Sequence, residues 1–504
     1  MGCVFAISAC KDKNAFEAFK PIEEVYDIYE DQSFDDGAYV KYGKYADYIA
    51  KNRVFENENF GSFYNTFYKK AGKRILESTG DRKLLVIPVD FYGYTCDNLN
   101  VKKSEYIENL NKAFFGVAKN NKYVSVAEYY NRSSYGKLRI SGKVCDEFYR
   151  FSVAFNILNE YTSHTRDDVY NEYPKIIEWY EKTYGESIDE YRINPEDPNS
   201  EVAMYLVYTA PYNSDDTGNS DFFWAYTFER RPISWSSYST LISITGEPDA
   251  HTFIHEVGHL FGLVDYYPKN SDKAASNKVI QPSGMIDMMD SSIGDHSAMS
   301  KMMLNWARPY HVKNNCSITI KPLITNGDLI LINDSWNGTV FDEYYLIEFY
   351  SPLGLNAFDV TNGNSEAKLP TLPGIKIHHV DARLAYFVSK GGTTTFSHYC
   401  TEQYVDVESG FGNVVGFAHD NSTYPSSTDE QKVLRNYLYE LQLNKVGHPV
   451  PSCATNENLF HRNDSFEVTN YNGTVNTEKY KITVKSLSFY EAEIDIKKIE
   501  AAVE

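Results

Sequence analysis

Residues 251–265 read His251-Thr252-Phe253-Ile254-His255-Glu256-Val257-Gly258-His259-Leu260-Phe261-Gly262-Leu263-Val264-Asp265, and this stretch decides how the fold is interpreted. Two histidines four residues apart lie one above the other on the same face of an α-helix, so His255 and His259 can offer imidazole nitrogens to one metal ion. Glu256 stands between them, where a carboxylate can deprotonate a metal-bound water. The H-E-x-x-H order therefore predicts a helix that carries two metal ligands and a general base.

The end of this stretch predicts a third ligand. Gly262 can adopt left-handed backbone dihedrals without a steric penalty, so the chain can leave the helix there and fold back. Asp265 would then reach the same ion, and the fourth coordination position would stay open for water. An open position is typical of catalytic zinc sites, whereas structural sites are closed by four protein ligands.

The alternative interpretation is an ordinary buried helix that happens to carry two histidines. Three features argue against it. Asp249 is a suitable N-cap, and Gly262 and Asp265 fall where a reversal followed by a third ligand requires them. The helix also has an apolar stripe beside its polar face, formed by Phe253, Ile254, Val257, Leu260 and Phe261.

His251 continues the four-residue spacing of the histidines and competes for the role of third ligand. Eight residues of straight helix span about 12 Å, which is too far for His251 and His259 to share one small ion. We therefore expect His251 to begin the helix and to flank the site without binding the metal.

Length and composition favour a large globular protein. At 504 residues the chain exceeds what one hydrophobic core usually serves, so at least two domains are expected. Its formal net charge of −20 disfavours nucleic acid or an anionic membrane as a partner. Seven scattered cysteines without a C-x-x-C pair indicate neither a zinc knuckle nor a disulfide-dense scaffold. No apolar run approaches the roughly 18 residues that a transmembrane helix needs.

The start of the chain bears on localisation. Residues 1–10 are apolar and end in Ile7-Ser8-Ala9-Cys10, which resembles the end of a bacterial lipoprotein signal with Cys10 as the lipid-bearing residue. The basic region and the long apolar part of such signals are missing, so either the start lies upstream or the resemblance is accidental. We favour the first alternative, which predicts an extracellular or surface-anchored protein. Residues 11–80 are acidic and aromatic, and they either wrap the catalytic domain or act as an inhibitory pro-segment.

Two regions with different patterns follow along the chain. Residues 81–310 alternate predicted strands and helices, which indicates an α+β catalytic domain. Strands are expected at 84–91, 137–144 and 201–208, and helices at 104–114 (capped by Ser104), 124–130 and 165–184, the last split at Pro174. Residues 311–500 contain short strand-like runs at 317–324, 328–332, 344–349, 374–380, 480–484 and 491–496. Their spacing predicts a β-rich, sandwich-like C-terminal domain.

Several motifs together resemble the immune-inhibitor-A-like secreted metallopeptidases, relatives of the metzincins in which Asp replaces the usual third histidine. The main match is H-E-V-G-H-L-F-G-L-V-D-Y-Y at 255–267, and weaker motifs follow in the family's order at 84–91, 125–138, 344–348 and 373–381. The resemblance spans roughly residues 84–470, which is most of the chain. It implies a metzincin-like zincin domain followed by the β-rich domain.

The resemblance implies roles residue by residue. His255, His259 and Asp265 would bind one zinc ion, and Glu256 would be the catalytic base. Met289 matches the methionine of the turn beneath the metal, where a thioether forms an apolar floor without binding zinc. Zinc is favoured over calcium because two imidazoles suit a borderline-soft ion. Calcium in the β-rich domain stays an unsupported alternative, since no D-x-D-x-D-G loop marks a site for it.

Two positions depart from the family pattern. Tyr226 stands where a histidine is common, and Asn305 replaces a glycine. Neither position belongs to the ligand set. The group that stabilises the tetrahedral oxyanion is left open among Tyr266, Tyr267 and His296.

These features predict a zinc endopeptidase, secreted or held at the cell surface, that acts on protein or peptide substrates. The alternative is a cell-surface binding protein that uses the zincin scaffold to dock host or matrix glycoprotein, which the β-rich C-terminal region motivates. An intact H-E-x-x-H motif argues against a purely adhesive role, because binding alone does not need the glutamate.

Overall fold

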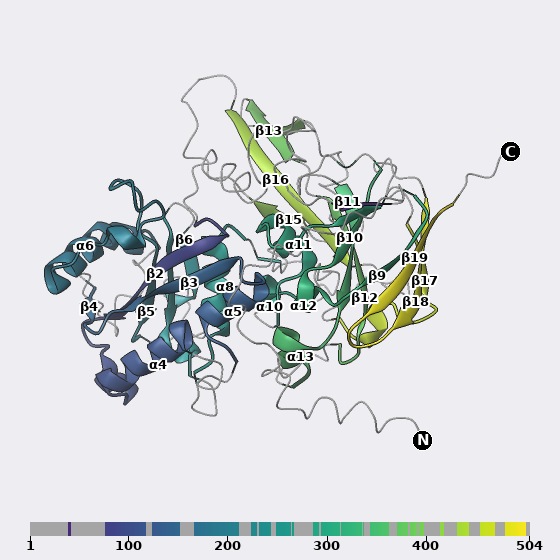
Figure 1. Cartoon of the computed structure of the whole chain (residues 1–504). Helices are drawn as coiled ribbons and strands as arrows, with labels where there is room; N and C mark the ends of the chain where they lie inside the picture. Colours follow the sequence, from purple (N-terminus) through teal and green to yellow (C-terminus); the bar gives the residue numbers. More distant parts are fainter. Residues whose placement is uncertain are drawn as a thin grey trace. The chain divides into compact units, whose positions relative to one another are not determined.

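The computed structural model describes residues 39–41, 76–116, 123–151, 166–210, 223–228, 231–242, 248–263, 265–266, 286–291, 294–312, 314–334, 336, 343–361, 370–381, 384–390, 393–397, 414–417, 431–442, 454–468 and 479–499. These residues mix helices and sheets, so the fold is of the α+β type (Figure 1). Contacts between residues divide the chain into two compact units. The first unit comprises 68–132 and 136–263, and the second unit comprises 1–67, 133–135 and 264–504.

The first unit is built on a six-stranded sheet in the order β3-β2-β5-β7-β6, with β4 also paired to β2. Its strands are β2 (Gly80–Asp90), β3 (Leu138–Val144), β4 (Tyr149–Arg150), β5 (Met204–Tyr208), β6 (Tyr226–Phe228) and β7 (Ile233–Ser237). Neighbouring strands are parallel except for β6, which pairs antiparallel with β7 at the edge. Strand β5 is buried along its whole length, as expected where both faces of a parallel sheet are covered.

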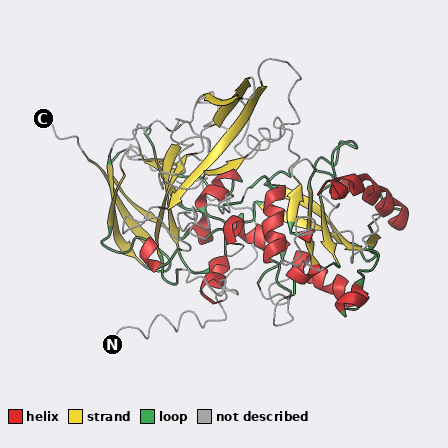
Figure 2. Ribbon diagram, turned by 180° about the vertical axis from the view of Figure 1, so that it is seen from behind, coloured by secondary structure: helices red, strands yellow, loops and turns green. Residues whose placement is uncertain are grey.

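Helices cover both faces of this sheet (Figure 2). They are α4 (Lys103–Phe115), α5 (Val126–Ser133), α6 (Arg166–Tyr184) and α8 (His251–Leu260), with 3-10 turns at Cys96–Leu99, Asp189–Tyr191 and Tyr238–Thr240. Alternate residues of a strand point to opposite faces. Leu206 of β5 shares a core with Tyr173 and Ile176 of α6. Tyr205 contacts Phe253 of α8 on the other face, with ring centroids 5.1 Å apart.

One local prediction for α6 and one for α4 were wrong. Helix α6 runs unbroken through Pro174, where a split was expected. Proline removes one backbone hydrogen bond, but the helix buries Val169 before it and Ile176 after it in the same core. Burial of this continuous apolar stripe outweighs the lost bond. Ser104 is not the cap of α4, because the N-cap is Lys102 and it makes no side-chain capping bond.

The second unit contains two sheets that are mostly antiparallel. The larger sheet has the order β1-β8-β10-β11-β12-β16-β13-β14, with β15 paired to β16. Its strands are β1 (Tyr39–Lys41), β8 (Tyr310–Val312), β10 (Leu329–Ile332), β11 (Glu343–Tyr350), β12 (Gly374–Asp381), β13 (Leu384–Lys390), β14 (Thr393–Ser397), β15 (Val414–Phe417) and β16 (Gln431–Gln442). The smaller sheet has the order β17-β18-β19-β9, formed by β9 (Cys316–Ile320), β17 (Ser465–Val468), β18 (Tyr480–Leu487) and β19 (Ala492–Lys498).

The two sheets of the second unit bury apolar side chains in one shared core. Its members include Ile347 and Ile377 of the larger sheet and Ile482 and Ile494 of the smaller sheet. The helices of this unit are short: α10 (Met288–Ser291), α11 (Ala298–Met303), α12 (Leu323–Asn326) and α13 (Ala357–Thr361), with 3-10 turns at Gly354–Asn356 and Asn456–Asn458. The strand expected at 317–324 ends at Ile320, because Pro322 cannot donate to a sheet and instead is the N-cap of α12.

The division between the units falls at residues 263–264, whereas the sequence predicted a domain boundary at 310. Helix α11 accounts for the difference because it is held by strand β11. The backbone N–H of Ala298 donates to Oε2 of Glu348 at 2.7 Å. The segment that follows the histidine helix therefore belongs with the β-rich unit.

Several predictions fall on residues that the structure leaves undescribed. Cys10 and most of the segment 11–80 are among them, so the lipoprotein and pro-segment interpretations stay predictions. Among the described residues, no helix is both long and apolar enough to cross a lipid bilayer.

Candidate metal centre

Aromatic packing in the first unit places helix α8. Phe253 stacks on Phe114 of α4 with ring centroids 4.9 Å apart, and both rings contact Tyr205 of β5. The Tyr130 hydroxyl of α5 donates to the carbonyl of Ile254 at 2.7 Å. These contacts fix the apolar side of α8, so the polar side chains of the histidine motif are left on the remaining face.

The N-cap of α8 differs by one residue from the prediction. The helix begins at His251 as expected, but its N-cap is Ala250 instead of Asp249. Asp249 still supports the first turn, because its Oδ1 accepts a hydrogen bond from the backbone N–H of His251 at 3.2 Å. The same carboxylate contacts Nδ1 of His251, whose ring stacks on Tyr123 with centroids 4.1 Å apart. His251 is thereby held at the start of the helix.

His255, Glu256 and His259 form a cluster of potential metal ligands within the described part of the chain. One ligand atom from each residue lies within 4.8 Å of the others. The two imidazole rings have centroids 5.0 Å apart and an interplanar angle of 85°. His255 and Glu256 are 7% and 5% exposed, and His259 is half-buried. Two imidazoles and a carboxylate at this spacing could hold a borderline-soft divalent ion.

The turn after α8 fixes the orientation of His259. Gly262 has a φ of +91°, so the predicted left-handed exit from the helix is confirmed. The N–H of Gly262 donates to the carbonyl of His259 at 2.9 Å, and that of Leu263 donates to Gly258 at 3.2 Å. The turn brings the Leu263 carbonyl to 2.8 Å from Nδ1 of His259. Because a carbonyl only accepts, Nδ1 is the donor in this contact, which in the neutral ring leaves Nε2 as the nitrogen that can bind a metal.

Glu256 is held by two hydroxyl groups of the neighbouring sheet. Thr227 Oγ1 lies 2.9 Å from Oε2 of Glu256 and 2.8 Å from its carbonyl oxygen. Ser234 lies opposite Thr227 in the strand pair, with the two hydroxyl oxygens 2.7 Å apart, and its hydroxyl lies 3.3 Å from the Glu256 carbonyl oxygen. Neither residue could be predicted as part of the site, because no spacing rule links two strands to a later helix. The available signal was that a threonine and a serine occur in short strands next to apolar residues.

Two predicted site residues belong to the second unit. Asp265 is half-buried, and Met289 is fully buried. The cluster on α8 belongs to the first unit. Asp265 as the third ligand and Met289 as the residue beneath the metal therefore stay predictions.

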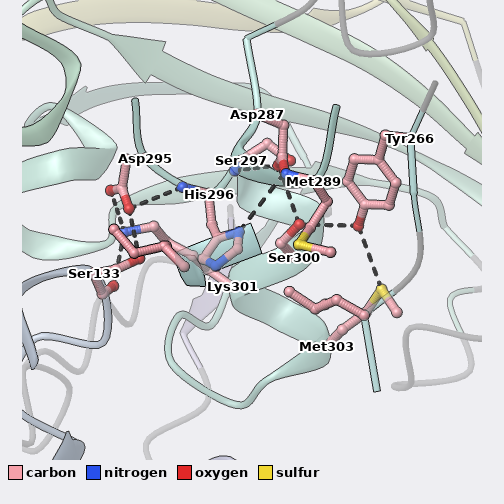
Figure 3. A network of polar contacts seen from close by, with 12 residues as sticks. Ser133, Tyr266, Asp287, Met289, Asp295, His296, Ser297, Ser300, Lys301 and Met303 are labelled. Atoms are coloured by element: carbon pink, nitrogen blue, oxygen red, sulfur yellow. Dashed lines mark hydrogen bonds and ion pairs between the residues drawn. The ribbon is translucent and has the colours of Figure 1, made fainter. Parts of the chain in front are cut away.

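The segment that contains Met289 forms part of a buried polar network in the second unit (Figure 3). The fully buried Asp287 accepts hydrogen bonds from the backbone N–H groups of Met289 and Ser297, both at 2.7 Å. The backbone N–H of Tyr266 donates to the carbonyl of Met289 at 2.8 Å. These bonds join the segment at Tyr266 to the turn that contains Met289.

Two of the oxyanion candidates are engaged in this network. Nδ1 of His296 lies 3.7 Å from Oδ1 of Asp287. Burial by itself would raise the pKa of Asp287, but His296 and the backbone donors outweigh it and lower the pKa to about 2. The Tyr266 hydroxyl accepts a hydrogen bond from Ser300 at 2.9 Å. The third candidate, Tyr267, lies outside the described residues.

Comparison with known proteins adds no assignment. No protein-family model matches the sequence, and a search of the curated proteins finds no significant match. The family interpretation therefore depends on the sequence motifs and on the ligand cluster of α8.

Proposed function

We propose that this protein is a zinc-dependent endopeptidase with a metzincin-like catalytic domain, similar to the immune-inhibitor-A-like metallopeptidases. The observation that carries the proposal is the cluster of His255, Glu256 and His259, whose ligand atoms lie within 4.8 Å of one another. A further observation supports it: a backbone carbonyl orients the ring of His259 through Nδ1, as is usual for metal-binding histidines.

The proposed mechanism uses four residues. His255, His259 and Asp265 would hold the zinc ion. A zinc ion held there would supply Lewis acidity, which would lower the pKa of water and polarise a scissile carbonyl. Glu256 takes a proton from the attacking water and delivers it to the leaving amine. Burial of Glu256 and its contact with Thr227 keep the carboxylate beside the histidines.

A peptide-library experiment tests this function. The full chain is incubated with proteome-derived peptides, with and without a chelator, and the new peptide ends are sequenced. We expect cleavage that the chelator abolishes and that Glu256→Gln slows about 10²–10⁴-fold, because the general base is lost while zinc stays bound. His259→Ala should lose zinc as well as activity. Unchanged cleavage by the Glu256→Gln protein would refute the assignment of the base.

We further propose that the substrates are extracellular proteins or peptides. The formal net charge of −20 argues against nucleic acid, and the resemblance of residues 1–10 to a lipoprotein signal supports secretion or surface anchoring through Cys10. Mass spectrometry of the mature N-terminus in the native host tests the anchor. A lipid-modified Cys10 is the expected result, and an unmodified Cys10 in the mature protein would contradict it.

A binding protein built on the same scaffold is the second candidate function. The two-sheet core of the second unit favours it, because such sheets often present ligand-binding loops. The buried Glu256 with its threonine partner favours catalysis, since adhesion does not need that carboxylate. Chelator-insensitive adhesion to a matrix glycoprotein, together with no cleavage of denatured casein, would decide for the binding protein.

A further inference from the structure

We propose that Thr227 is a positioning residue for Glu256, because its hydroxyl holds the carboxylate in the orientation that keeps it beside the two histidines. The inference rests on the proposed function, in which Glu256 is the general base. Thr227 lies on β6, the antiparallel edge strand of the first unit, so the positioning group comes from a different element than the ligands.

Three oxygen atoms surround the Thr227 hydroxyl. Ser234 Oγ lies at 2.7 Å, the Glu256 carbonyl at 2.8 Å and Glu256 Oε2 at 2.9 Å. A threonine hydroxyl has one hydrogen to donate. The Ser234 hydroxyl lies 3.3 Å from the Glu256 carbonyl but only 2.7 Å from Thr227 Oγ1. We therefore assign the Ser234 hydrogen to Thr227, which leaves the hydrogen of Thr227 for Glu256. A carboxylate is a stronger acceptor than a carbonyl oxygen inside a helix, so Thr227 donates to Oε2.

The environment strengthens this contact. Thr227, Ser234 and Glu256 are 6%, 0% and 5% exposed, so little water competes for their hydrogen bonds. Thr227 and Ser234 are direct partners in the register of the β6–β7 pair. The backbone of two paired strands therefore fixes the position of both hydroxyl groups.

The edge strand is itself held in place. The ring of Tyr226, the residue before Thr227, contacts Trp235 of β7 with centroids 5.2 Å apart. The guanidinium of Arg166 lies over the Tyr226 ring, 3.8 Å from the ring centroid. A positioning group needs such support, because a loosely held hydroxyl cannot restrict the residue that it contacts.

The benefit for catalysis follows from the flexibility of glutamate. Its terminal torsion has a broad distribution, so a carboxylate without a partner samples many orientations. A general base must lie within hydrogen-bond reach of the proton that it removes. Loss of the Thr227 hydroxyl would reduce the fraction of molecules with Glu256 in place. Turnover would slow, whereas substrate binding and the zinc ligands would be affected much less.

Matched variants separate positioning from general stability. Thr227→Val removes the hydroxyl and keeps the branched shape, and Thr227→Ser keeps the hydroxyl. Thr209→Val is the control: Thr209 is also fully buried in the first unit, and its hydroxyl donates to the backbone carbonyl of Tyr94 at 2.7 Å. The control therefore removes a hydrogen bond of another buried threonine away from Glu256.

Kinetics of the full chain give the first readout. We expect Thr227→Val to lower kcat about 10–100-fold, the range typical for residues that support a metal site, with much smaller changes in KM and zinc affinity. Thr227→Ser should restore most of kcat, and Thr209→Val should leave kcat unchanged. A wild-type kcat for Thr227→Val, or a loss that Thr227→Ser does not rescue, would overturn the proposal.

Crystal structures of the metal-free proteins give a second readout that is independent of activity. The Glu256 carboxylate should keep its position in the Thr227→Ser protein and rotate away from His255 and His259 in the Thr227→Val protein. An unmoved carboxylate in Thr227→Val would overturn the positioning role, even in an active enzyme. A wild-type protein that neither binds zinc nor cleaves peptides, while the carboxylate still rotates in the variant, would instead refute the proposed function alone.

Discussion

Gly262 shapes the candidate metal centre more directly than any other single position outside the motif. Its φ of +91° turns the chain back after α8 and brings the Leu263 carbonyl to Nδ1 of His259. A side chain at such a dihedral costs about 1–2 kcal/mol, because Cβ approaches the following carbonyl. The glycine therefore supports both the end of the helix and the orientation of the His259 ring.

We expect Gly262→Ala to weaken zinc binding about tenfold, because a distorted turn no longer orients His259. Gly185→Ala is the matched control: Gly185 has a φ of +64°, and a Cβ built there meets no atom within 4 Å. Both variants should lose about 1–2 kcal/mol of unfolding free energy in urea. Zinc affinity is measured by competition with a chromophoric chelator, and equal affinities of the two variants would contradict the expectation.

Asp359 is a buried carboxyl group in the second unit. It is 3% exposed, and its Oδ2 accepts a hydrogen bond from the Tyr350 hydroxyl at 3.1 Å. Burial raises the pKa of Asp359 to about 7, and Asp295 adds to this shift, whereas the Tyr350 hydrogen bond and the charge of Lys376 oppose it. Near neutral pH, the group is therefore charged in the unfolded chain but partly protonated in the folded protein.

This shift predicts a pH dependence of stability. The folded-state pKa of Asp359 lies above the ordinary value of 3.8. Its contribution to the free energy of unfolding is therefore fully present below pH 3.8 and is lost as the pH rises through about 7. The total loss is on the order of 4 kcal/mol. We expect Asp359→Asn to remove this pH-dependent loss. The unfolding free energy measured in urea should then differ less between mildly acidic and mildly basic buffers than it does in the wild type. An identical pH dependence of the two proteins would contradict a raised pKa.

Among the elements, α11 illustrates how the second unit carries charge in its interior (Figure 3). Lys301 is fully buried, and its Nζ lies 2.5 Å from Oδ2 of Asp295 and donates to the Ser133 carbonyl at 2.8 Å. Burial lowers the pKa of Lys301, and the charge of Asp295 opposes that shift. The ammonium group thus connects α11 to two segments that are distant from each other in the sequence.

Lys301→Met should destabilise the second unit by about 3–5 kcal/mol, because the Asp295 carboxylate is left buried without its compensating charge. Adding Asp295→Asn to the same protein should restore part of the stability, since the uncompensated charge is then removed. Urea unfolding monitored by circular dichroism measures both effects. A Lys301→Met protein as stable as the wild type would show that the ion pair contributes nothing to the free energy of unfolding.

The elements also show what the sequence could predict. Helix α8 was predictable because its two histidines, the glutamate between them and its exit glycine lie in one contiguous segment. The unbroken course of α6 was not predictable, because the rule that proline interrupts a helix ignores the burial of the residues on both sides of Pro174. The contact of Thr227 and Ser234 with Glu256 was not predictable either, since it depends on the pairing of β6 with β7 and on the packing of α8 against both strands.

For the chain as a whole, the mixed α+β character could be predicted, but the division into units could not. Residues 133–135 belong to the second unit, although their neighbours in sequence belong to the first. Ser133 accepts from Lys301, and the Tyr135 hydroxyl donates to the carbonyl of Leu323. Such partners lie more than a hundred residues further along the chain, and no local pattern indicates them.

The central claim is that one zinc ion is bound by His255, His259 and Asp265 beside Glu256. The role of Asp265 is the part of this claim that most needs a test, because Asp265 belongs to one compact unit and the two histidines belong to the other. A crystal structure of the zinc-loaded full chain, with anomalous data at the zinc edge, measures its coordination directly. The expected result is one ion with two imidazole nitrogens at about 2.0–2.1 Å and an Asp265 oxygen at about 2.0–2.2 Å. An Asp265 side chain turned away from the ion, or zinc bound elsewhere, would contradict the claim.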